Sequence, residues 1–316
     1  MSFFDFKIFA GSSNYPLAEK IAGQLGKSLG LIELKRFSDG EIWAKYRENI
    51  RGSDVFIVQS TNPPAENLLE LLIMIDAAKR ASARKITAVI PYFGYSRQDR
   101  KDQPRVSITA KLVANLITVA GADRVMTMDL HAAQIQGFFD IPFDHLYGSS
   151  VFIGEFDKIK ENLAVVSPDV GGIKIARSYA KRLDSPLVVI DKRRPSQNLA
   201  EVVNIIGEVD GKNVLLVDDL IDTAGTFVGA IEALKAKGAK DVFGAVTHPL
   251  LSGPATERIL NCGIKSLFVS DTIPIHNYEI IKNKINIVSV AGIFAEAIRR
   301  TFKNESISSL FDVDKG

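Results

Sequence analysis

Short runs of apolar residues alternate along the chain with longer segments in which apolar residues recur at helical spacing. Short runs rich in β-branched side chains are typical of strands buried in a parallel sheet. The longer segments predict helices, among them one near 17–25, one near 65–81 and one ending near Arg300. Because strands and helices alternate, the pattern indicates βαβ units and an α/β fold with mainly parallel sheets flanked by helices. The predicted strands are 7–10, 55–58, 86–90, 125–128, 164–166, 187–190, 214–217, 242–246 and 267–269.

The pattern also repeats weakly between the two halves of the chain. Phe9-Ala-Gly-Ser-Ser-Asn14 precedes a predicted helix in the first half, and Val166-Ser-Pro-Asp-Val-Gly-Gly172 precedes one in the second. A chain of 316 residues is long for a single hydrophobic core. We therefore predict two related α/β domains, residues 1–148 and 149–316, with the tail at about 303–316 a candidate to pack on the first domain.

Composition narrows the classes of partner. The chain has 39 Lys and Arg against 37 Asp and Glu, so its net charge of +2 supplies no general attraction for nucleic acid or anionic membrane. The single cysteine, Cys262, fits a reducing compartment. We find no run as long as a membrane span and no signal-peptide pattern. We expect a cytoplasmic protein that binds neither nucleic acid nor membrane and that handles anions through local clusters.

The most informative segment is Val214–Thr226, Val-Leu-Leu-Val-Asp-Asp-Leu-Ile-Asp-Thr-Ala-Gly-Thr. A buried strand ends in Asp218 and Asp219, at the position where open α/β sheets bind ligands. A Thr/Gly loop and a helix follow, and N–H groups, hydroxyls and the helix N-terminus can hold a phosphate. Carboxylates beside a phosphate cradle fit a sugar phosphate. The alternative is that the aspartates only end a strand and cap a helix, which the whole Asp-Thr-x-Gly-Thr pattern makes less plausible.

Four further predicted strands also run into polar residues that suit phosphate chemistry. The cations after strand 86–90 can grip polyphosphate oxygens, although most charge runs are solvated loops. A lone histidine is usually structural, but His131 lies two residues after Asp129 at a strand end. Asp169 comes three residues after strand 164–166, and cations follow strand 187–190. The cations concerned are Arg97, Arg100, Lys101 and Arg105 after the first strand, and Lys192, Arg193 and Arg194 after the last.

The Val214–Thr226 segment resembles the phosphoribosyl-diphosphate loop of the phosphoribosyltransferases and of ribose-phosphate pyrophosphokinase. Five separate motifs occur in the order of the pyrophosphokinase family, over nearly the whole chain, so the chain is similar to the common phosphate-activated class of that family. The resemblance implies two phosphoribosyltransferase-like domains and the transfer of the ATP diphosphoryl group to ribose 5-phosphate, with Mg²⁺. It implies that the first domain contributes ATP-site elements and the second the ribose 5-phosphate loop. In the loop, Ala224 stands where the family often has glycine.

The resemblance also implies roles for single residues. The residues implied to bind ribose 5-phosphate are Asp218, Asp219, Asp222, Thr223, Ala224, Gly225 and Thr226. The residues implied to bind ATP are Phe37, Asp39, Glu41, Arg97, Gln98, Asp102 and His131. The implied catalytic residues, which neutralise charge on the transferring group, are Lys192 and Arg194 on a flexible loop together with His131. The implied Mg²⁺ ligands are His131 and Asp169, and no general base is evident.

The family resemblance further implies a homo-oligomer, a hexamer in the common class, in which Phe37 and its neighbours hold adenine across a subunit contact. It implies phosphate activation and ADP inhibition at a subunit interface. Residues matching parts of that regulatory site are Arg51, Arg105, Ser306 and Ser308. Pro104 and Asn49 depart from the usual pattern, so the phosphate response stays open.

Two alternatives remain at this point. A phosphoribosyltransferase would use the same ribose-phosphate loop but would need neither the Arg97 loop nor the Phe37 segment. A non-catalytic regulatory paralogue would bind nucleotides inside a hetero-oligomer and would show degraded catalytic positions. The retained residues favour the catalytic interpretation; they are Asp169, His131, Lys192, Arg194, Asp218 and Asp219.

Overall fold

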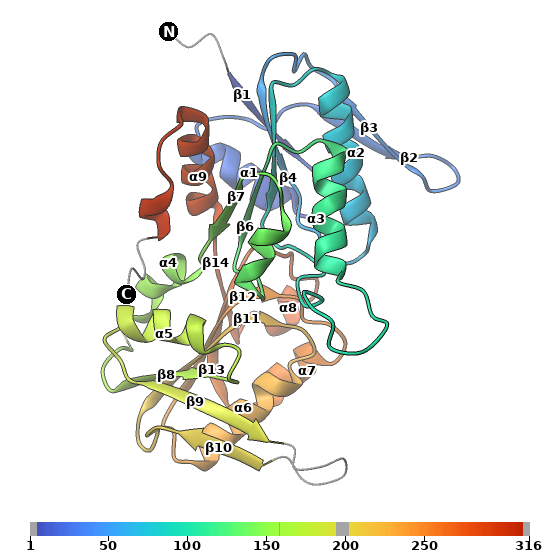
Figure 1. Ribbon diagram of the computed structural model, residues 1–316. Coiled ribbons are helices and arrows are strands. Elements are labelled where there is room, and N and C mark those ends of the chain that lie inside the picture. Colours follow the sequence, from blue (N-terminus) through green and yellow to red (C-terminus); the bar gives the residue numbers. More distant parts are fainter. Residues whose placement is uncertain (1–4, 158, 194–201, 312–316) are drawn as a thin grey trace. The chain divides into compact units, whose positions relative to one another are not determined.

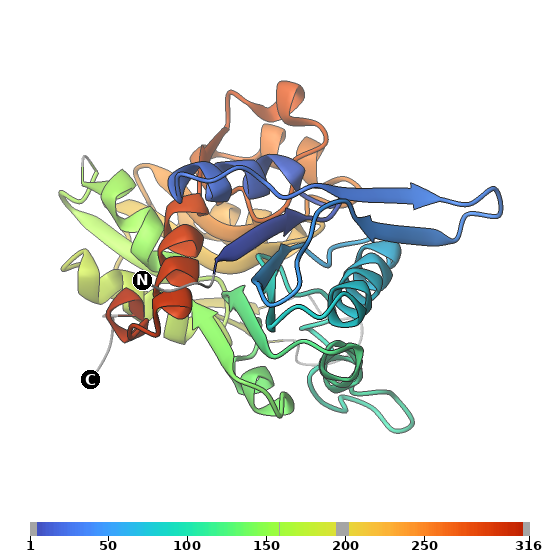
Figure 2. The ribbon, with the colours of Figure 1, turned by 90° about the horizontal axis from the view of Figure 1, so that it is seen from above.

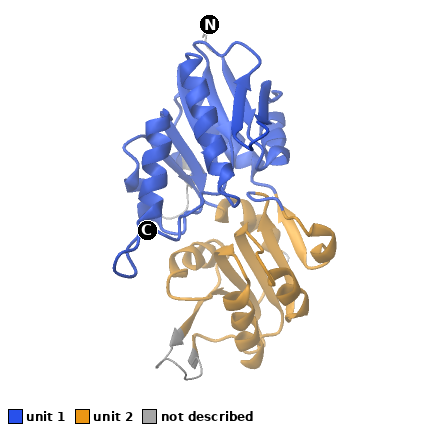
Figure 3. Cartoon of the chain, turned by 90° about the vertical axis from the view of Figure 1, so that its right-hand side faces the viewer, with its two compact units in different colours: residues 1–147, 272–274, 289–311 blue, residues 148–271, 275–288, 312–316 orange. Residues whose placement is uncertain are grey.

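The computed structural model describes residues 5–157, 159–193 and 202–311, and the chain divides into two compact units (Figures 1 and 3). Of these residues, those up to 147, together with 272–274 and 289–311, form unit 1. Those within 148–271 and 275–288 form unit 2. The C-terminal helix therefore belongs to unit 1, although it follows unit 2 in the sequence.

Unit 1 is built on a parallel sheet of five strands in the order β1-β4-β5-β6-β7. A separate antiparallel hairpin, β2–β3, extends from this unit (Figure 2). The strands are β1 (Phe6–Ala10), β2 (Ile32–Arg36), β3 (Ile42–Tyr46), β4 (Asp54–Val58), β5 (Lys85–Ile90), β6 (Arg124–Met128) and β7 (Phe143–Leu146). The helices are α1 (Tyr15–Gln24), α2 (Glu66–Arg80), α3 (Thr109–Ala120), η1 (Ala133–Phe138), α9 (Ala291–Lys303) and η3 (Ser308–Phe311).

Alternate residues of the unit 1 strands supply two hydrophobic layers. Phe9, Val55 and Ile57 belong to a core with α2 and α3, which are amphipathic along that side. Side chains one residue out of step point to the opposite face. There Phe6 of β1 packs on Phe302 of α9, with ring centroids 4.7 Å apart, and α9 packs against α1. Helix α9 thus completes the second face of the unit 1 sheet.

Unit 2 contains a sheet of seven strands in the order β10-β9-β8-β11-β12-β13-β14, parallel except for β10. The strands are β8 (Leu163–Ser167), β9 (Leu187–Arg193), β10 (Val202–Ile206), β11 (Asn213–Ile221), β12 (Val242–Pro249), β13 (Ile264–Ser270) and β14 (Ile285–Val288). The helices are α4 (Ser149–Phe152), η2 (Ile153–Phe156), α5 (Ile173–Arg182), α6 (Gly225–Ala236), α7 (Ala255–Asn261) and α8 (Tyr278–Ile281).

The direction of winding changes between β8 and β11, and this change positions the site. Val214 and Leu216 of β11 pack in a core with α6, whereas Leu215 and Val217 pack in a core with α5. The apolar run is therefore buried on both faces, as predicted for a central parallel strand. Helix α5 leads from β8 to β9, and α6 leads from β11 to β12. The connections that leave the carboxyl ends of β8 and β11 therefore run in opposite directions along the sheet. Such a switch point is where open α/β sheets bind ligands.

The α/β class with mainly parallel sheets is confirmed, and every predicted strand is present. Some bounds differ. Strand β11 continues past Val217 to Ile221 because residues 218–221 keep pairing with β12, so both aspartates lie inside the last part of the strand. Strand β9 similarly continues to Arg193 by pairing with β10. The strands that were not predicted are β2, β3, β7, β10 and β14, which are short or lie at sheet edges.

Candidate functional site

Three carboxyl groups gather at the switch point of unit 2. Asp219 is buried, with 6% of its surface exposed, Asp218 is half-buried and Asp169 is exposed. The backbone N–H of Asp219 donates to Oδ1 of Asp218 at 2.9 Å. Burial, followed by the negative charges of Asp219 and Asp169, raises the pKa of Asp218 well above its usual range. Hydroxyl donors or a cation brought to this point would relieve that repulsion.

Two hydrogen bonds within the turn after β8 fix the position of Asp169. Its Oδ1 accepts from the N–H of Gly172 at 2.9 Å, and its carbonyl accepts from Oγ of Ser167 at 2.7 Å. A Cβ on Gly171 would lie 3.2 Å from that carboxylate oxygen, and one on Gly172 would lie 2.9 Å from Oγ of Ser167. The glycine pair lets the turn close tightly, and the second carboxylate oxygen accepts no hydrogen bond from the residues described.

The predicted phosphate loop is a row of peptide groups that face one way. The carbonyls of Ile221 and Asp222 accept from the N–H groups of Leu251 and Ser252 at 3.1 and 2.9 Å. The Thr223 carbonyl accepts from Nη1 of Arg258 at 2.9 Å. In a trans peptide the next N–H points opposite to the carbonyl.

The N–H groups of Thr223 and Ala224, which follow the Asp222 and Thr223 carbonyls, accordingly face away from these donors, and the N–H of Gly225 comes next at the start of helix α6. Within the described part of the chain they have no acceptor. They precede or open helix α6, which is 12 residues long, and such a concave row of amides at a helix N-terminus binds anions. Ala224 has the left-handed conformation, with φ +62° and ψ 5°, which glycine adopts without penalty.

The loop after β1 in unit 1, which the weak repeat relates to the Asp169 turn, is closed by the chain's own side chains. The Ser12 N–H donates to Oε1 of Glu70 at 2.7 Å, and the Ser13 N–H donates to Oε1 of Gln59 at 3.0 Å. The Gln59 amide in turn donates to Glu70 at 2.8 Å. A Cβ on Gly11 would lie 2.2 Å from Oε1 of Gln59, so glycine is required for this approach. The carboxylate of Glu70 therefore joins this loop to helix α2.

The segments predicted to bind ATP phosphates follow neighbouring strands of unit 1. Strands β5 and β6 are adjacent and parallel, so the Arg97 and His131 loops both leave the carboxyl edge of the sheet. The amide of Gln134 joins the loops by donating to Oδ2 of Asp99 at 2.9 Å. Gly94 permits the first loop to turn, because a Cβ there would lie 2.2 Å from the Thr61 carbonyl. The predicted residues are exposed; they are Arg97, Gln98, Asp102 and His131.

The predicted adenine residues occupy the turn of the β2–β3 hairpin. Phe37 is 55% exposed, and its N–H donates to the Glu41 carbonyl at 2.9 Å. Oδ1 of Asp39 accepts from the Glu41 N–H at 3.1 Å, which shapes the turn. An aromatic ring and two carboxylates are therefore presented to solvent at the end of a hairpin.

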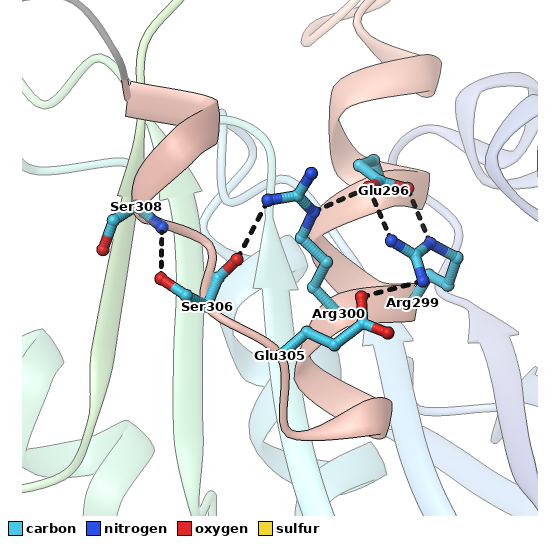
Figure 4. A network of polar contacts seen from close by, with 6 residues as sticks. All are labelled: Glu296, Arg299, Arg300, Glu305, Ser306 and Ser308. Carbon is cyan, nitrogen blue, oxygen red and sulfur yellow. Dashed lines mark hydrogen bonds and ion pairs between the residues drawn. The ribbon is translucent and has the colours of Figure 1, made fainter.

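The predicted regulatory residues are spread over unit 1. Arg51 lies before β4, at the amino end of the sheet, whereas Arg105 follows the Arg97 loop. Ser306 and Ser308 follow α9 and are held by the network in Figure 4. Nη1 of Arg300 donates to the Ser306 carbonyl at 2.9 Å, and the Ser308 N–H donates to Oγ of Ser306 at 3.2 Å.

Glu296 anchors that network. It accepts from Arg299 and Arg300, whose hydrogen bonds lower the pKa of Glu296 to about 2. Arg299 also pairs with Glu305 at 2.9 Å. The segment after α9 is thereby attached to the helix.

The predicted catalytic loop is largely outside the described residues. The backbone of Lys192 pairs with Val203 in the β9–β10 ladder, but the side chain of Lys192 lies outside the description. Arg194 lies outside it altogether. Both assignments stay predictions. Arg258, in contrast, was not predicted, since an isolated arginine in α7 has no sequence pattern to mark it.

A doubly wound sheet, with carboxylates and an amide nest at its switch point, defines an α/β protein suited to sugar phosphates. Residues 6–121 match the N-terminal domain of ribose phosphate pyrophosphokinase, and residues 192–312 match the phosphoribosyl synthetase-associated domain. The chain is 60% identical to a ribose-phosphate pyrophosphokinase of Chlorobaculum tepidum, over 97% of this chain and 95% of the relative. It is 55% identical to one of Clostridium tetani, over 97% of both chains.

A solved structure agrees. Phosphoribosylpyrophosphate synthetase from Mycobacterium smegmatis is 39% identical, with a TM-score of 0.89, and the match covers 95% of this chain and 99% of that one. The chain belongs to the ribose-phosphate pyrophosphokinase family, a family of enzymes. The family resemblance predicted from the sequence is therefore confirmed. None of the helices in the described parts of the chain combines the length and apolarity needed to cross a membrane.

Proposed function

We propose that this enzyme transfers the diphosphoryl group of ATP to the anomeric hydroxyl of ribose 5-phosphate, yielding AMP and 5-phosphoribosyl 1-diphosphate for nucleotide biosynthesis. The observation that supports this most directly is in unit 2. The open N–H groups of Thr223–Gly225 lie in the same chain segment as Asp218 and Asp219, so one element offers both anion donors and hydroxyl acceptors. The identity of 60% to a named pyrophosphokinase over almost the full chain supports the reaction.

In this proposal the amides of the loop hold the 5-phosphate, and Asp218 and Asp219 accept hydrogen bonds from ribose hydroxyls. The anomeric oxygen attacks the β-phosphorus in line, the bond to the bridging oxygen breaks, and AMP leaves with that oxygen. The hydroxyl proton passes to solvent in this proposal, because the sequence marks no general base for it. The protein then acts mainly by positioning and by stabilising charge.

We further propose that Lys192, Arg194 and His131 neutralise charge on the transferring group. ATP would be bound by the exposed Arg97, Gln98 and Asp102 with His131, and its adenine by the hairpin turn of Phe37, Asp39 and Glu41. These assignments come from the family resemblance. The exposure of the described side chains is compatible with ligand access.

Magnesium is the proposed cofactor, with His131 and Asp169 as its protein donors. Asp169 fits, because it is an exposed oxygen donor close enough to Asp218 to raise its pKa. Among the described residues, no group of three or more His, Cys, Asp and Glu is arranged to hold a metal ion. Sparse protein ligation suits Mg²⁺, which keeps waters and relies on substrate phosphates. When bound, it neutralises phosphoryl charge.

We also propose, from the family resemblance, a cytoplasmic homo-oligomer, with a hexamer as the expected form. Phosphate and ADP are the proposed effectors. Their site would include Arg51, Arg105, Ser306 and Ser308, and the departures at Pro104 and Asn49 make the phosphate response the part to measure.

Phosphorus NMR of the protein with Mg-ATP and ribose 5-phosphate tests the reaction. Equal growth of AMP and a sugar-linked diphosphate, dependent on the sugar, is expected. ADP formation would mean γ-phosphoryl transfer and would refute the mechanism. Turnover only with a nucleobase and the diphosphate sugar would indicate a phosphoribosyltransferase, and tight ATP binding without turnover would indicate a regulatory paralogue. An Asp218→Asn/Asp219→Asn variant serves as the control for contaminating activity.

A further inference from the structure

Arg258 reaches the phosphate loop from a different helix. It lies in α7, its side chain is exposed, and its Nη1 donates to the Thr223 carbonyl at 2.9 Å. The same nitrogen would lie 3.3 Å from a Cβ placed on Gly225. The guanidinium group therefore lies directly behind the two peptides that open helix α6.

Three successive carbonyls, those of Ile221, Asp222 and Thr223, accept hydrogen bonds, and only the last accepts from a side chain. Strand β11 ends at Ile221, and the carbonyls of Ile221 and Asp222 are still reached by backbone N–H groups of Leu251 and Ser252. Thr223 lies beyond the end of the strand pairing, and its carbonyl accepts from the side chain of Arg258. A charged donor makes the stronger kind of hydrogen bond.

The hydrogen bond from Arg258 opposes a rotation of the Thr223–Ala224 peptide that would relieve backbone strain at Ala224. With φ at +62°, Ala224 has a conformation that is unfavourable for any residue with a Cβ. Rotating the Thr223–Ala224 peptide by about half a turn would return Ala224 to negative φ. The same rotation would turn the Thr223 carbonyl toward the ligand side and the Ala224 N–H away from it. A bound anion would then meet a carbonyl oxygen in place of a donor.

We propose that Arg258 is a positioning residue for the 5-phosphate, holding the Thr223–Ala224 peptide in the orientation that presents its N–H to the anion. The inference rests on the proposed function of the loop and deepens it. Arg258 acts through the Thr223 carbonyl, and the anion itself is bound by the loop amides.

The first test is steady-state AMP formation by the full chain with Arg258→Ala. We expect the KM for ribose 5-phosphate to rise about tenfold, corresponding to the loss of one charge-assisted hydrogen bond. The KM for ATP and the kcat at saturating sugar should stay within about twofold. The reason is that the 5-phosphate is bound equally in the ground state and the transition state, so weaker phosphate binding raises only the KM for the sugar. Lys237→Ala removes the same charge at the far end of α6, has an exposed side chain, and should leave all three values unchanged.

The second test separates positioning from a direct contact with phosphate. Glycine accepts positive φ without penalty, so an Ala224→Gly background should need Arg258 less. There Arg258→Ala should raise the KM only about threefold, so the two changes couple in a double-mutant cycle. An equal rise in both backgrounds, or an unchanged KM in Arg258→Ala, would overturn the proposal.

Arg258→Lys keeps one charged donor at the same helix position and should lose less than half of the effect of alanine on a logarithmic scale. A lysine variant as impaired as alanine would also count against the proposal. Absence of AMP formation by the unaltered chain would instead contradict the proposed function, so the two failures are distinguishable.

Discussion

Replacing Ala224 by glycine should leave stability almost unchanged, which is unusual for a buried alanine. The left-handed backbone of Ala224 costs about 1–2 kcal/mol, and glycine would remove this penalty. Against that gain, Ala224 is 4% exposed and packs in the core with α6, so losing its methyl group costs about 0.8 kcal/mol. The freer unfolded chain of the glycine variant costs about 0.4–1 kcal/mol more. We expect a net change within about 1 kcal/mol of zero.

Ala230 supplies the matched comparison, because it is fully buried in the same core and lies inside α6 with ordinary helical geometry. Ala230→Gly loses the same methyl and about 1 kcal/mol of helix propensity, with no strain to relieve. We expect a cost of about 2 kcal/mol, or roughly 4–8 °C in melting temperature for a unit of this size.

Urea and thermal unfolding of both variants, followed by circular dichroism, give the comparison. Since two units need not unfold together, the transition that the variants shift is the one compared. If Ala224→Gly destabilised the chain as much as Ala230→Gly, Ala224 would not have positive φ in solution, and the account of the phosphate loop would be wrong.

Three further predictions concern the carboxyl groups and the catalytic loop. Because the pKa of Asp218 is raised in the folded chain, the native state retains a proton that the unfolded state loses, so stability falls as pH rises from about 4 through the raised pKa. Asp218→Asn should raise the unfolding midpoint at pH 7 and flatten this slope, and an unchanged slope in pH-dependent melting would contradict the assigned burial. Glu70→Ala should destabilise the chain by about 1–3 kcal/mol, because it leaves one N–H of the buried Gln59 amide and the part-buried N–H of Ser12 without their acceptor. Glu70→Gln keeps one acceptor oxygen and should cost less in chemical denaturation, so equal losses would argue against that contact. Lys192→Ala should lower kcat about 10²-fold while ribose 5-phosphate binding changes far less, and unchanged turnover in the AMP assay would refute its role.

Local pattern determined much of this molecule. The apolar run 214–217 predicted a strand buried on both faces, and β11 is buried in that way between α5 and α6. The Asp-Thr-x-Gly-Thr order predicted a loop opening a helix, and α6 begins at Gly225. Such features follow from burial, periodicity and turn chemistry, which depend on residues near in sequence. Short edge strands such as β14 escaped prediction because their alternation extends over too few residues.

Tertiary structure decided how distant segments meet. The order of strands places β8 beside β11, and only this brings Asp169 to the electrostatic neighbourhood of Asp218. Pairing with β12 extends β11 past its apolar run, and α7 brings Arg258 to the Thr223 carbonyl. Glu70 fills the unit 1 loop because α2 packs beside it. These outcomes depend on the packing of whole helices and strands. A local sequence pattern cannot reveal a donor or acceptor that a distant part of the chain supplies.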